Sequence, residues 1–423
     1  MPTGRTSVNE KSSSRPLMIV TGTLPGEAGV GAIILRDLLK RFEERFCFIA
    51  GFSEEGEPAG QTARPPIGVK GVISRQFQFP CLRTRLGRGP SKWVALVASQ
   101  IQAALAIRRC TREIVAEANQ LNVGGVLVVL ESAAAMSVGW RVAGALGVPL
   151  LAYVWDHGPQ ILRQAGLNRL LRRRFSADFS KSLKTACRGA VVSETMQSDY
   201  GKEFGLGCLI LRHGVVGQAS YVEDGPEADE GAHDRSDCPW TIGFAGTDYA
   251  RSAWDCLMAA LDHVGWNLAG RPVRVRVMGG MLRLSARGPR WIEFLGYRSP
   301  EEAVRLLKES DLNFLSHPFE SDWFEFSRYS FPTKLSSYVA AGAPVLVFAP
   351  PYSSLETFAQ DHPVGIHCNQ LDSEELASRL SGFAESLSAQ ASAREAVAQV
   401  GGSLLSSERF FKTFCDFTAP ASN

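Results

Sequence analysis

Short apolar segments of the kind that form buried strands alternate with amphipathic helical segments, and this alternation occurs twice along the chain. The first series opens with LMIVT at 17–21, followed by the Gly-rich turn GTLPGEAGVG at 22–31 and a helical pattern. The second series opens with TIGFAG at 241–246. Strand, Gly-rich turn and helix in this order begin a doubly wound α/β unit. The sequence therefore predicts an α/β protein with two Rossmann-like domains.

The segment between the two series gives the expected domain boundaries. Residues 221–239, YVEDGPEADEGAHDRSDCP, are acidic, contain Gly and Pro, and have little apolar content, which is typical of an exposed linker or loop. We therefore expect an N-terminal domain over 16–220 and a C-terminal domain over 240–400. The polar start, 1–15, is predicted to be a disordered leader, and 401–423 a C-terminal helix and tail.

Composition excludes several classes of protein. No apolar stretch reaches the roughly 18–20 residues that a membrane-spanning helix requires, and the polar N-terminus lacks the apolar core of a signal peptide. We therefore expect a cytoplasmic protein, or one on the cytoplasmic face of a membrane. The nine cysteines are scattered and form no CxxC, which argues against a disulfide framework and against a structural zinc site.

Charge is distributed unevenly along the chain. Residues 60–212 carry 21 Lys and Arg against 8 Asp and Glu, a net charge of +13, whereas 213–423 carry 17 against 27, a net charge of −10. The basic part of the chain, 60–212, is thus suited to an anionic partner. The basic run RLLRRRF at 169–175 is interleaved with apolar residues, which favours a surface helix on an anionic membrane, although most charge runs are simply solvated. Nucleic acid is not expected, because no nucleic-acid-binding module is present.

Four segments in a fixed order carry a resemblance to a known family. They are VVSETMQSDYGKEFG at 191–205, TIGFAGTDYARSAWDCLMAAL at 241–261, FLGYRSPEEAVRLLKESDLNFLSHPFE at 294–320 and FPTKLSSYVAAGAPVLVF at 331–348. Together they resemble the retaining "group 1", or family 4, glycosyltransferases over about residues 17–400. The resemblance implies the GT-B fold, with an acceptor domain and a donor domain facing each other across a cleft. It also implies a nucleoside-diphosphate sugar as donor, and neither a cofactor nor a metal.

The sequence departs from this family at three positions. The family carries two Glu residues eight positions apart before the Ala-Gly turn, and the aligned positions here hold Tyr329 and Ser337. In the family the second Glu holds the ribose hydroxyls, and Ser337 can make at most one such hydrogen bond. His213 also stands where the family usually has Asn.

The resemblance points to a donor site in the second domain. Loss of the diphosphate from the sugar builds negative charge, which cations and helix N-termini stabilise. Arg251 follows the loop after the 241–246 strand, and Lys334 precedes a helix, where a cation is unfavourable unless it meets an anion. Thr333 is suited equally to capping that helix and to donating its hydroxyl to phosphate. The expected phosphate-binding and donor-binding residues are Gly246, Thr247, Arg251, Thr333, Lys334 and Ser337, and Tyr297 and Arg298 are expected to contact the base.

Three side chains are expected to contact the sugar or the acceptor. Asp156 and His157 follow a predicted strand at 148–155, and Glu320 follows another, and doubly wound sheets bind ligands at the carboxyl ends of their strands. A structural role fits each of them as well. Gly29 and Gly31 lie in the first Gly-rich turn, where small residues allow a backbone amide to approach an acceptor, although a tight turn alone would also require them.

These residues predict an enzyme that transfers a sugar from a nucleoside-diphosphate sugar to a glycan or a lipid-linked acceptor, with retention of configuration, in cell-surface polysaccharide assembly. Two alternatives remain open from the sequence. One is a nucleotide-sugar epimerase of the same fold, for which no pair of acid and base carboxylates is evident. The other is an inactive GT-B scaffold that binds a sugar nucleotide, which the absence of the Glu pair favours.

Overall fold

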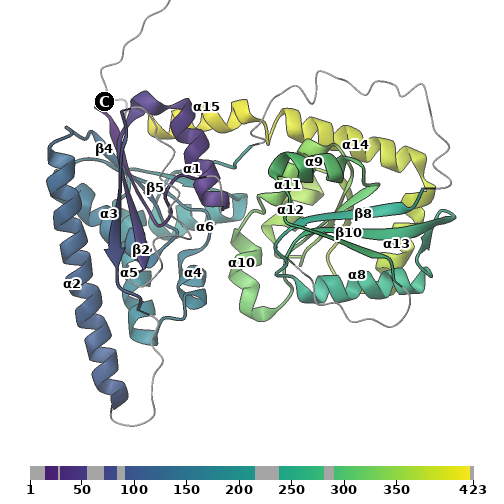
Figure 1. Ribbon diagram of the computed structural model, residues 1–423, viewed down its shortest axis with the longest axis horizontal. Coiled ribbons are helices and arrows are strands. Elements are labelled where there is room, and N and C mark those ends of the chain that lie inside the picture. Colours follow the sequence, from purple (N-terminus) through teal and green to yellow (C-terminus); the bar gives the residue numbers. More distant parts are fainter. Residues whose placement is uncertain are drawn as a thin grey trace, which may run out of the picture. The chain divides into compact units, whose positions relative to one another are not determined.

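The computed structural model describes residues 15–26, 29–54, 71–82, 91–214, 238–280 and 290–419. The predicted leader and most of the predicted linker therefore lie outside the described residues. The chain divides into two compact units (Figure 1). The first unit comprises 1–153, 162–189 and 417–423, and the second comprises 154–161 and 190–416.

The N-terminal sheet has the strand order β3-β2-β1-β4-β5-β6-β7. Strand β1 pairs in parallel with β2 and β4, and the β2–β3 and β4–β5 pairs are also parallel. The strand expected at 17–21 is confirmed, and β3 lies in a part of the chain for which no strand was predicted. The strands are β1 (Leu17–Thr21), β2 (Phe46–Glu54), β3 (Ile73–Phe79), β4 (Gly125–Val129), β5 (Leu150–Tyr153), β6 (Arg188–Val191) and β7 (Cys208–Ile210).

Local sequence signals fix the ends of several helices around this sheet. Ser132 caps α3 through a hydrogen bond from the Ala135 amide, and the helix ends at Gly147 in the left-handed conformation. The Asn168 side chain caps α5 in the same way. Helix α3 packs against β4 and lies between α2 and α5. The helices are α1 (Val30–Arg41), α2 (Ser91–Asn119), α3 (Ala133–Leu146), α4 (Gly158–Gln164), α5 (Arg169–Thr185) and α6 (Glu194–Phe204), with a 3-10 turn, η1 (Glu43–Arg45).

The C-terminal sheet has the order β11-β10-β8-β12-β13-β14, and the short strand β9 pairs antiparallel with β10. The other pairings in this sheet are parallel. The strands are β8 (Trp240–Gly246), β9 (Asn267–Leu268), β10 (Arg271–Gly279), β11 (Ile292–Gly296), β12 (Leu312–Ser316), β13 (Val345–Phe348) and β14 (Gly365–Cys368).

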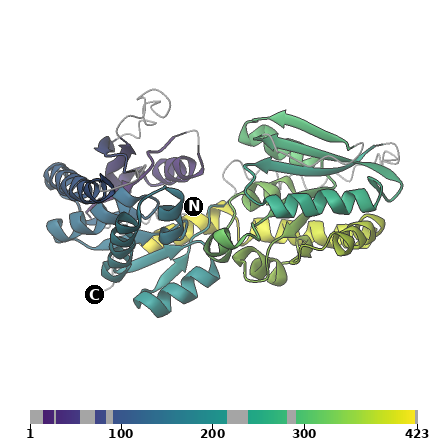
Figure 2. The same ribbon diagram turned by 90° about the horizontal axis from the view of Figure 1, so that it is seen from below.

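Helices cover both faces of this sheet, with α8 on one side and α9 and α11 on the other (Figures 1 and 2). Such two-sided cover is the arrangement that parallel sheets require. The elements are α8 (Arg251–His263), α9 (Pro300–Lys308), η3 (Ser321–Trp323), α10 (Phe324–Tyr329), α11 (Lys334–Ala341), α12 (Ser354–Asp361), α13 (Ser373–Glu385), α14 (Leu387–Gly402) and α15 (Ser407–Thr418). The prediction of two Rossmann-like α/β halves is therefore confirmed.

The core of the second unit forms where α8 packs on its sheet. Trp254, on α8, is fully buried, and its ring meets Phe244 of β8 and Phe314 of β12 edge to face, with centroid distances of 5.0 and 4.7 Å. Aromatic pairs of this geometry add to the stabilisation that burial provides. This packing fixes the first turn of α8 beside the carboxyl end of β8, which is where the candidate site lies.

Candidate functional site

Two glycines bring the carboxyl ends of β8 and β10 into direct backbone contact. Gly246 and Gly279 have φ angles of +116° and +119°, which L side chains rarely adopt. A Cβ on Gly279 would lie 2.3 Å from the Gly246 carbonyl oxygen, so no side chain fits there. The loop after β8 is thus held against the neighbouring strand end, at the edge of the sheet where doubly wound folds bind ligands.

Lys334, the first residue of α11, lies against this loop. Its Nζ donates a hydrogen bond to the Thr247 carbonyl oxygen, and a Cβ on Gly246 would come within 2.7 Å of the Lys334 Cε. The ammonium group also lies 4.6 Å from the ring centroid of Phe244 and 4.5 Å from that of Tyr249. The structure therefore brings together three of the predicted donor residues, Gly246, Thr247 and Lys334.

The electrostatics of Lys334 favour an anionic ligand. Burial lowers the pKa of Lys334 to about 8, and the nearby Asp248 carboxylate opposes this shift only in part. Among the described residues no salt bridge to Lys334 is formed, so aromatic faces and one carbonyl oxygen are its partners. A cation at the start of a helix also opposes the helix dipole. An anion bound here would offset both the desolvation and the dipole.

Arg251 and the Glu320 carboxylate both lie at the first turn of α8. Arg251 is 58% exposed in its side chain and pairs with Asp255 of the same helix at 3.3 Å. The Glu320 Oε1 accepts a hydrogen bond of 3.1 Å from the Ser252 amide, so this carboxylate occupies the N-terminus of α8. Its Oε2 is buried without a hydrogen-bond partner among the described residues. Glu320 thus takes a position that a phosphate would otherwise be suited to fill.

Two other predicted donor residues lie on or next to α11. Thr333 precedes the helix, but its side chain makes no capping hydrogen bond. Ser337 lies about one turn after Lys334 and is half-buried. Its neighbour Tyr338 was not predicted, and its fully buried hydroxyl accepts a 3.0 Å hydrogen bond from the Ala245 amide. Tyr338 thereby ties α11 to the end of β8.

The two expected base-contacting residues lie in a separate loop after β11. Tyr297 is 82% exposed. Arg298 donates a 3.0 Å hydrogen bond to the Tyr297 carbonyl oxygen and pairs with Glu302 at 3.1 Å. Within the part of the chain that the structure describes, no hydrogen bond, ion pair or ring contact joins this loop to Lys334.

Asp156 and His157, which follow β5, contact the segment at the end of α10. The Asp156 Oδ1 accepts a hydrogen bond from the Ser330 hydroxyl, and burial raises the pKa of Asp156. The His157 ring stacks on Tyr329 with a centroid distance of 4.7 Å, and its Nδ1 lies 2.9 Å from the Tyr200 hydroxyl. Tyr329 and Ser330 therefore hold both candidate side chains.

The Tyr329 hydroxyl is held by a carboxylate. It donates a 3.0 Å hydrogen bond to the Asp199 Oδ2, which also accepts one of 2.9 Å from Arg328. The Tyr329 carbonyl oxygen accepts a further bond of 2.6 Å from Ser193. These hydrogen bonds hold Tyr329 at the start of the segment that leads to Lys334.

Glu131, which was not predicted as a site residue, holds the start of the Gly-rich turn of the first unit by hydrogen bonds. The Glu131 Oε1 accepts hydrogen bonds from the Thr21 hydroxyl at 2.6 Å and from the Gly22 and Thr23 amides at 3.0 Å each. Burial raises the pKa of Glu131, and these hydrogen bonds oppose that shift. Gly29 has a φ of +89° just before α1, while Gly31 lies inside that helix. Glu131 follows β4, so the strand-end rule used for Asp156 would have found it.

No three His, Cys, Asp or Glu side chains among the described residues come together as ligands of a metal ion would. None of the described helices combines the length and the apolar character that are needed to cross a membrane.

Comparison with known proteins finds likeness in structure only. The sequence matches no family model and no curated protein. The structure is similar to Anabaena HepE in complex with UDP, with a TM-score of 0.58, 12% identity and 95% and 98% of the two chains covered. It is similar to trehalose 6-phosphate synthase from Burkholderia multivorans, with a TM-score of 0.60, 15% identity and 96% of each chain covered. It is also similar to sucrose-phosphate synthase from Thermosynechococcus elongatus, with a TM-score of 0.61, 13% identity and coverage of 95% and 98%. With its two parallel-sheet halves, the chain has the GT-B fold.

Proposed function

We propose that this protein is a glycosyltransferase that moves a sugar from a nucleoside-diphosphate sugar to a glycan or a lipid-linked acceptor. The observation that carries the proposal is Lys334, a half-buried cation at a strand-end loop that pairs with no carboxylate among the described residues. The structural likeness to HepE in complex with UDP and with UDP-glucose supports a diphosphate as the anion. The proposed role in cell-surface polysaccharide assembly rests on the family resemblance.

The proposed reaction exchanges one bond at the anomeric carbon of the donor sugar. The bond from that carbon to the diphosphate oxygen breaks, and a bond to the acceptor hydroxyl oxygen forms. The hydroxyl proton leaves with the diphosphate, and we propose that the configuration is retained. Negative charge develops on the departing diphosphate, where the Lys334 ammonium group and the backbone of the β8 loop would stabilise it. Asp156 and His157 would contact the sugar or the acceptor, and Tyr329 and Ser330 would hold them in place.

A screen of donors tests the proposal. The protein should show a raised unfolding temperature with a UDP, GDP or TDP sugar, because a ligand that binds only the folded state stabilises it. It should then release the nucleoside diphosphate in the presence of an acceptor.

The alternative is an inactive GT-B scaffold that binds a sugar nucleotide. It is favoured by Ser337, which stands where the family that the sequence resembles has a Glu. Stabilisation by a sugar nucleotide without turnover over a wide acceptor set would support the scaffold, and no stabilisation by any nucleotide would contradict both.

Transfer is expected to persist in excess EDTA, since Lys334 is proposed to supply the positive charge that a metal ion would otherwise give. The measurement is the initial rate of nucleoside-diphosphate release with and without the chelator. A control reaction with added magnesium shows whether a metal accelerates the reaction. Complete loss of activity in EDTA, restored by magnesium or manganese, would show that the proposed metal-independent class is wrong.

A further inference from the structure

Helix α2 carries a row of large apolar side chains on its solvent-facing side. The exposed fractions of Trp93, Val94, Val97, Ile101 and Leu105 are 70, 70, 55, 55 and 60%. The opposite side of the helix, which includes Ala103, Ile107, Cys110 and Ile114, is buried. Because these exposed residues recur at spacings of three and four, they form one stripe, which extends for about 18 Å along the helix axis. We call these five residues the α2 stripe.

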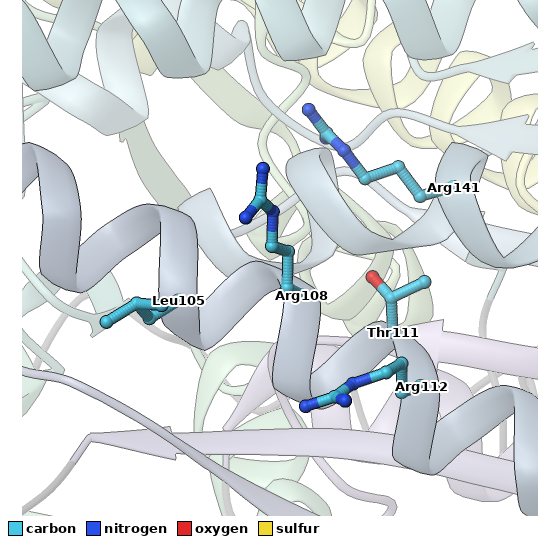
Figure 3. A pocket seen from close by; sticks show the side chains of 5 residues that line it. All are labelled: Leu105, Arg108, Thr111, Arg112 and Arg141. Carbon is cyan, nitrogen blue, oxygen red and sulfur yellow. The ribbon is translucent and has the colours of Figure 1, made fainter.

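The stripe continues into basic residues at the same helical spacing. Arg108 and Arg112 follow Leu105 along the line of the stripe, and both are exposed. They line an open pocket with Leu105 and Thr111 of α2 and Arg141 of α3 (Figure 3). Arg141 pairs with Asp178 at 2.9 Å, whereas Arg108 and Arg112 have no carboxylate partner within the described ranges. An apolar segment therefore adjoins two uncompensated cations on one face.

Helix α2 lies at the outer edge of its unit (Figures 1 and 2). An apolar row of this size on a solvated face marks an interaction surface rather than a random exposure. If a second copy of the chain paired with the first through the α2 stripe, with the two α2 helices parallel, Arg108 and Arg112 of one copy would lie against those of the other. On an anionic bilayer, Trp93 and the aliphatic residues of the stripe would instead lie in the interface between water and lipid. The lipid phosphates would then contact Arg108 and Arg112.

We propose that the α2 stripe with Arg108 and Arg112 docks this protein on an anionic lipid bilayer, α2 lying in the plane of the interface. The α2 stripe thus replaces the basic run at 169–175, which the sequence predicted to lie on the membrane. Leu171 and Phe175 of that run are 0% exposed and belong to the core, so α5 offers only Leu170 as an exposed apolar neighbour of its arginines. The proposal is independent of the proposed glycosyl transfer, because its readout is binding to lipid.

The apolar half of the proposal is tested by two substitutions one residue apart on α2. Ile101→Asp puts a charge into the stripe, whereas Gln102→Asp puts the same charge on an exposed position about 100° around the helix. Co-sedimentation with vesicles of phosphatidylcholine and phosphatidylserine measures the partition coefficient. Ile101→Asp should lower it by about tenfold or more, since a charge at a lipid-facing position is strongly unfavourable. Gln102→Asp should leave it within about twofold. Both variants should keep the unfolding temperature of the wild type, because both positions are exposed.

The basic half is tested by a second matched pair. Arg108→Gln with Arg112→Gln removes two charges from the proposed face, and Arg172→Gln with Arg173→Gln removes two from α5. Each arginine lost from the docking face should lower the partition coefficient by about fivefold. High salt should release the wild-type protein, because screening weakens the attraction to anionic lipid. The α5 pair should have a much smaller effect.

Three results would overturn the proposal. The first is wild-type protein that does not pellet with anionic vesicles, and the second is pelleting that Ile101→Asp leaves unchanged. The third is a dimer in sedimentation velocity that Ile101→Asp dissociates while vesicle binding stays at the wild-type level, which would assign the stripe to a second copy. Equal pelleting with vesicles of phosphatidylcholine alone would remove the role of Arg108 and Arg112.

Discussion

Replacing Lys334 by Met is expected to weaken binding of a nucleoside diphosphate by roughly 10- to 150-fold, which corresponds to the 1.5–3 kcal/mol of a charge-assisted hydrogen bond. Met keeps most of the length and the unbranched apolar stem of the side chain but removes the ammonium group that faces the Phe244 and Tyr249 rings. The fold should be retained, because the lost Nζ partner is a single carbonyl oxygen. Isothermal titration with UDP and GDP measures the effect, and turnover with a sugar nucleotide should fall in parallel.

The pH dependence gives this variant a second readout. Since the pKa of Lys334 is lowered to about 8, the free protein loses this positive charge as the pH rises through that value. Wild-type affinity for the diphosphate should therefore fall above about pH 8, whereas the affinity of the Lys334→Met variant should stay level. Lys308→Met, at an exposed position on α9, is the matched control and should bind as the wild type does. Unchanged affinity in Lys334→Met would remove the proposed diphosphate site.

Trp254→Ala is expected to destabilise the second unit by about 3–5 kcal/mol, the range for removing a large buried aromatic side chain. Trp254 is fully buried and contacts both Phe244 and Phe314, so its loss leaves a cavity between α8 and the sheet. In scanning calorimetry the unfolding temperature of this unit should drop by roughly 6–20 °C. Because α8 begins beside the β8 loop, affinity for the diphosphate is expected to fall as well.

Trp291→Ala is the control for this loss of a tryptophan. Trp291 is 47% exposed, and its ring faces the Arg274 guanidinium group at 5.6 Å. Its removal should cost about 1 kcal/mol or less, because an exposed cation–π contact contributes about 0.5–1 kcal/mol. Equal destabilisation by the two substitutions would contradict the packing described for α8.

Local patterns in the sequence were sufficient to predict the two α/β halves, whereas the donor site stays a prediction. The apolar run 17–21 and the segment 241–246 are strands because each is short, apolar and followed by Gly and a helix. Gly246, Thr247 and Lys334, which the resemblance and the helix start at Lys334 predicted as donor residues, lie against one another in the structure. Tyr249 and Tyr338, which fix Lys334 and the β8 loop, were missed because aromatic residues carry no comparable sequence signal.

Contacts between residues far apart in the chain decided the rest. The bond from Ser330 to Asp156 joins positions 174 apart, and the bond from Thr21 to Glu131 joins positions 110 apart. No local pattern encodes such pairs, since they depend on the order in which strands assemble into a sheet. The periodicity of α2 likewise identifies two apolar faces but not the one that is covered. Only the packing of α2 beside α3 and α5 buries Ala103 and Ile107 and leaves Val97, Ile101 and Leu105 facing solvent, because a helix face is buried only where another element lies against it.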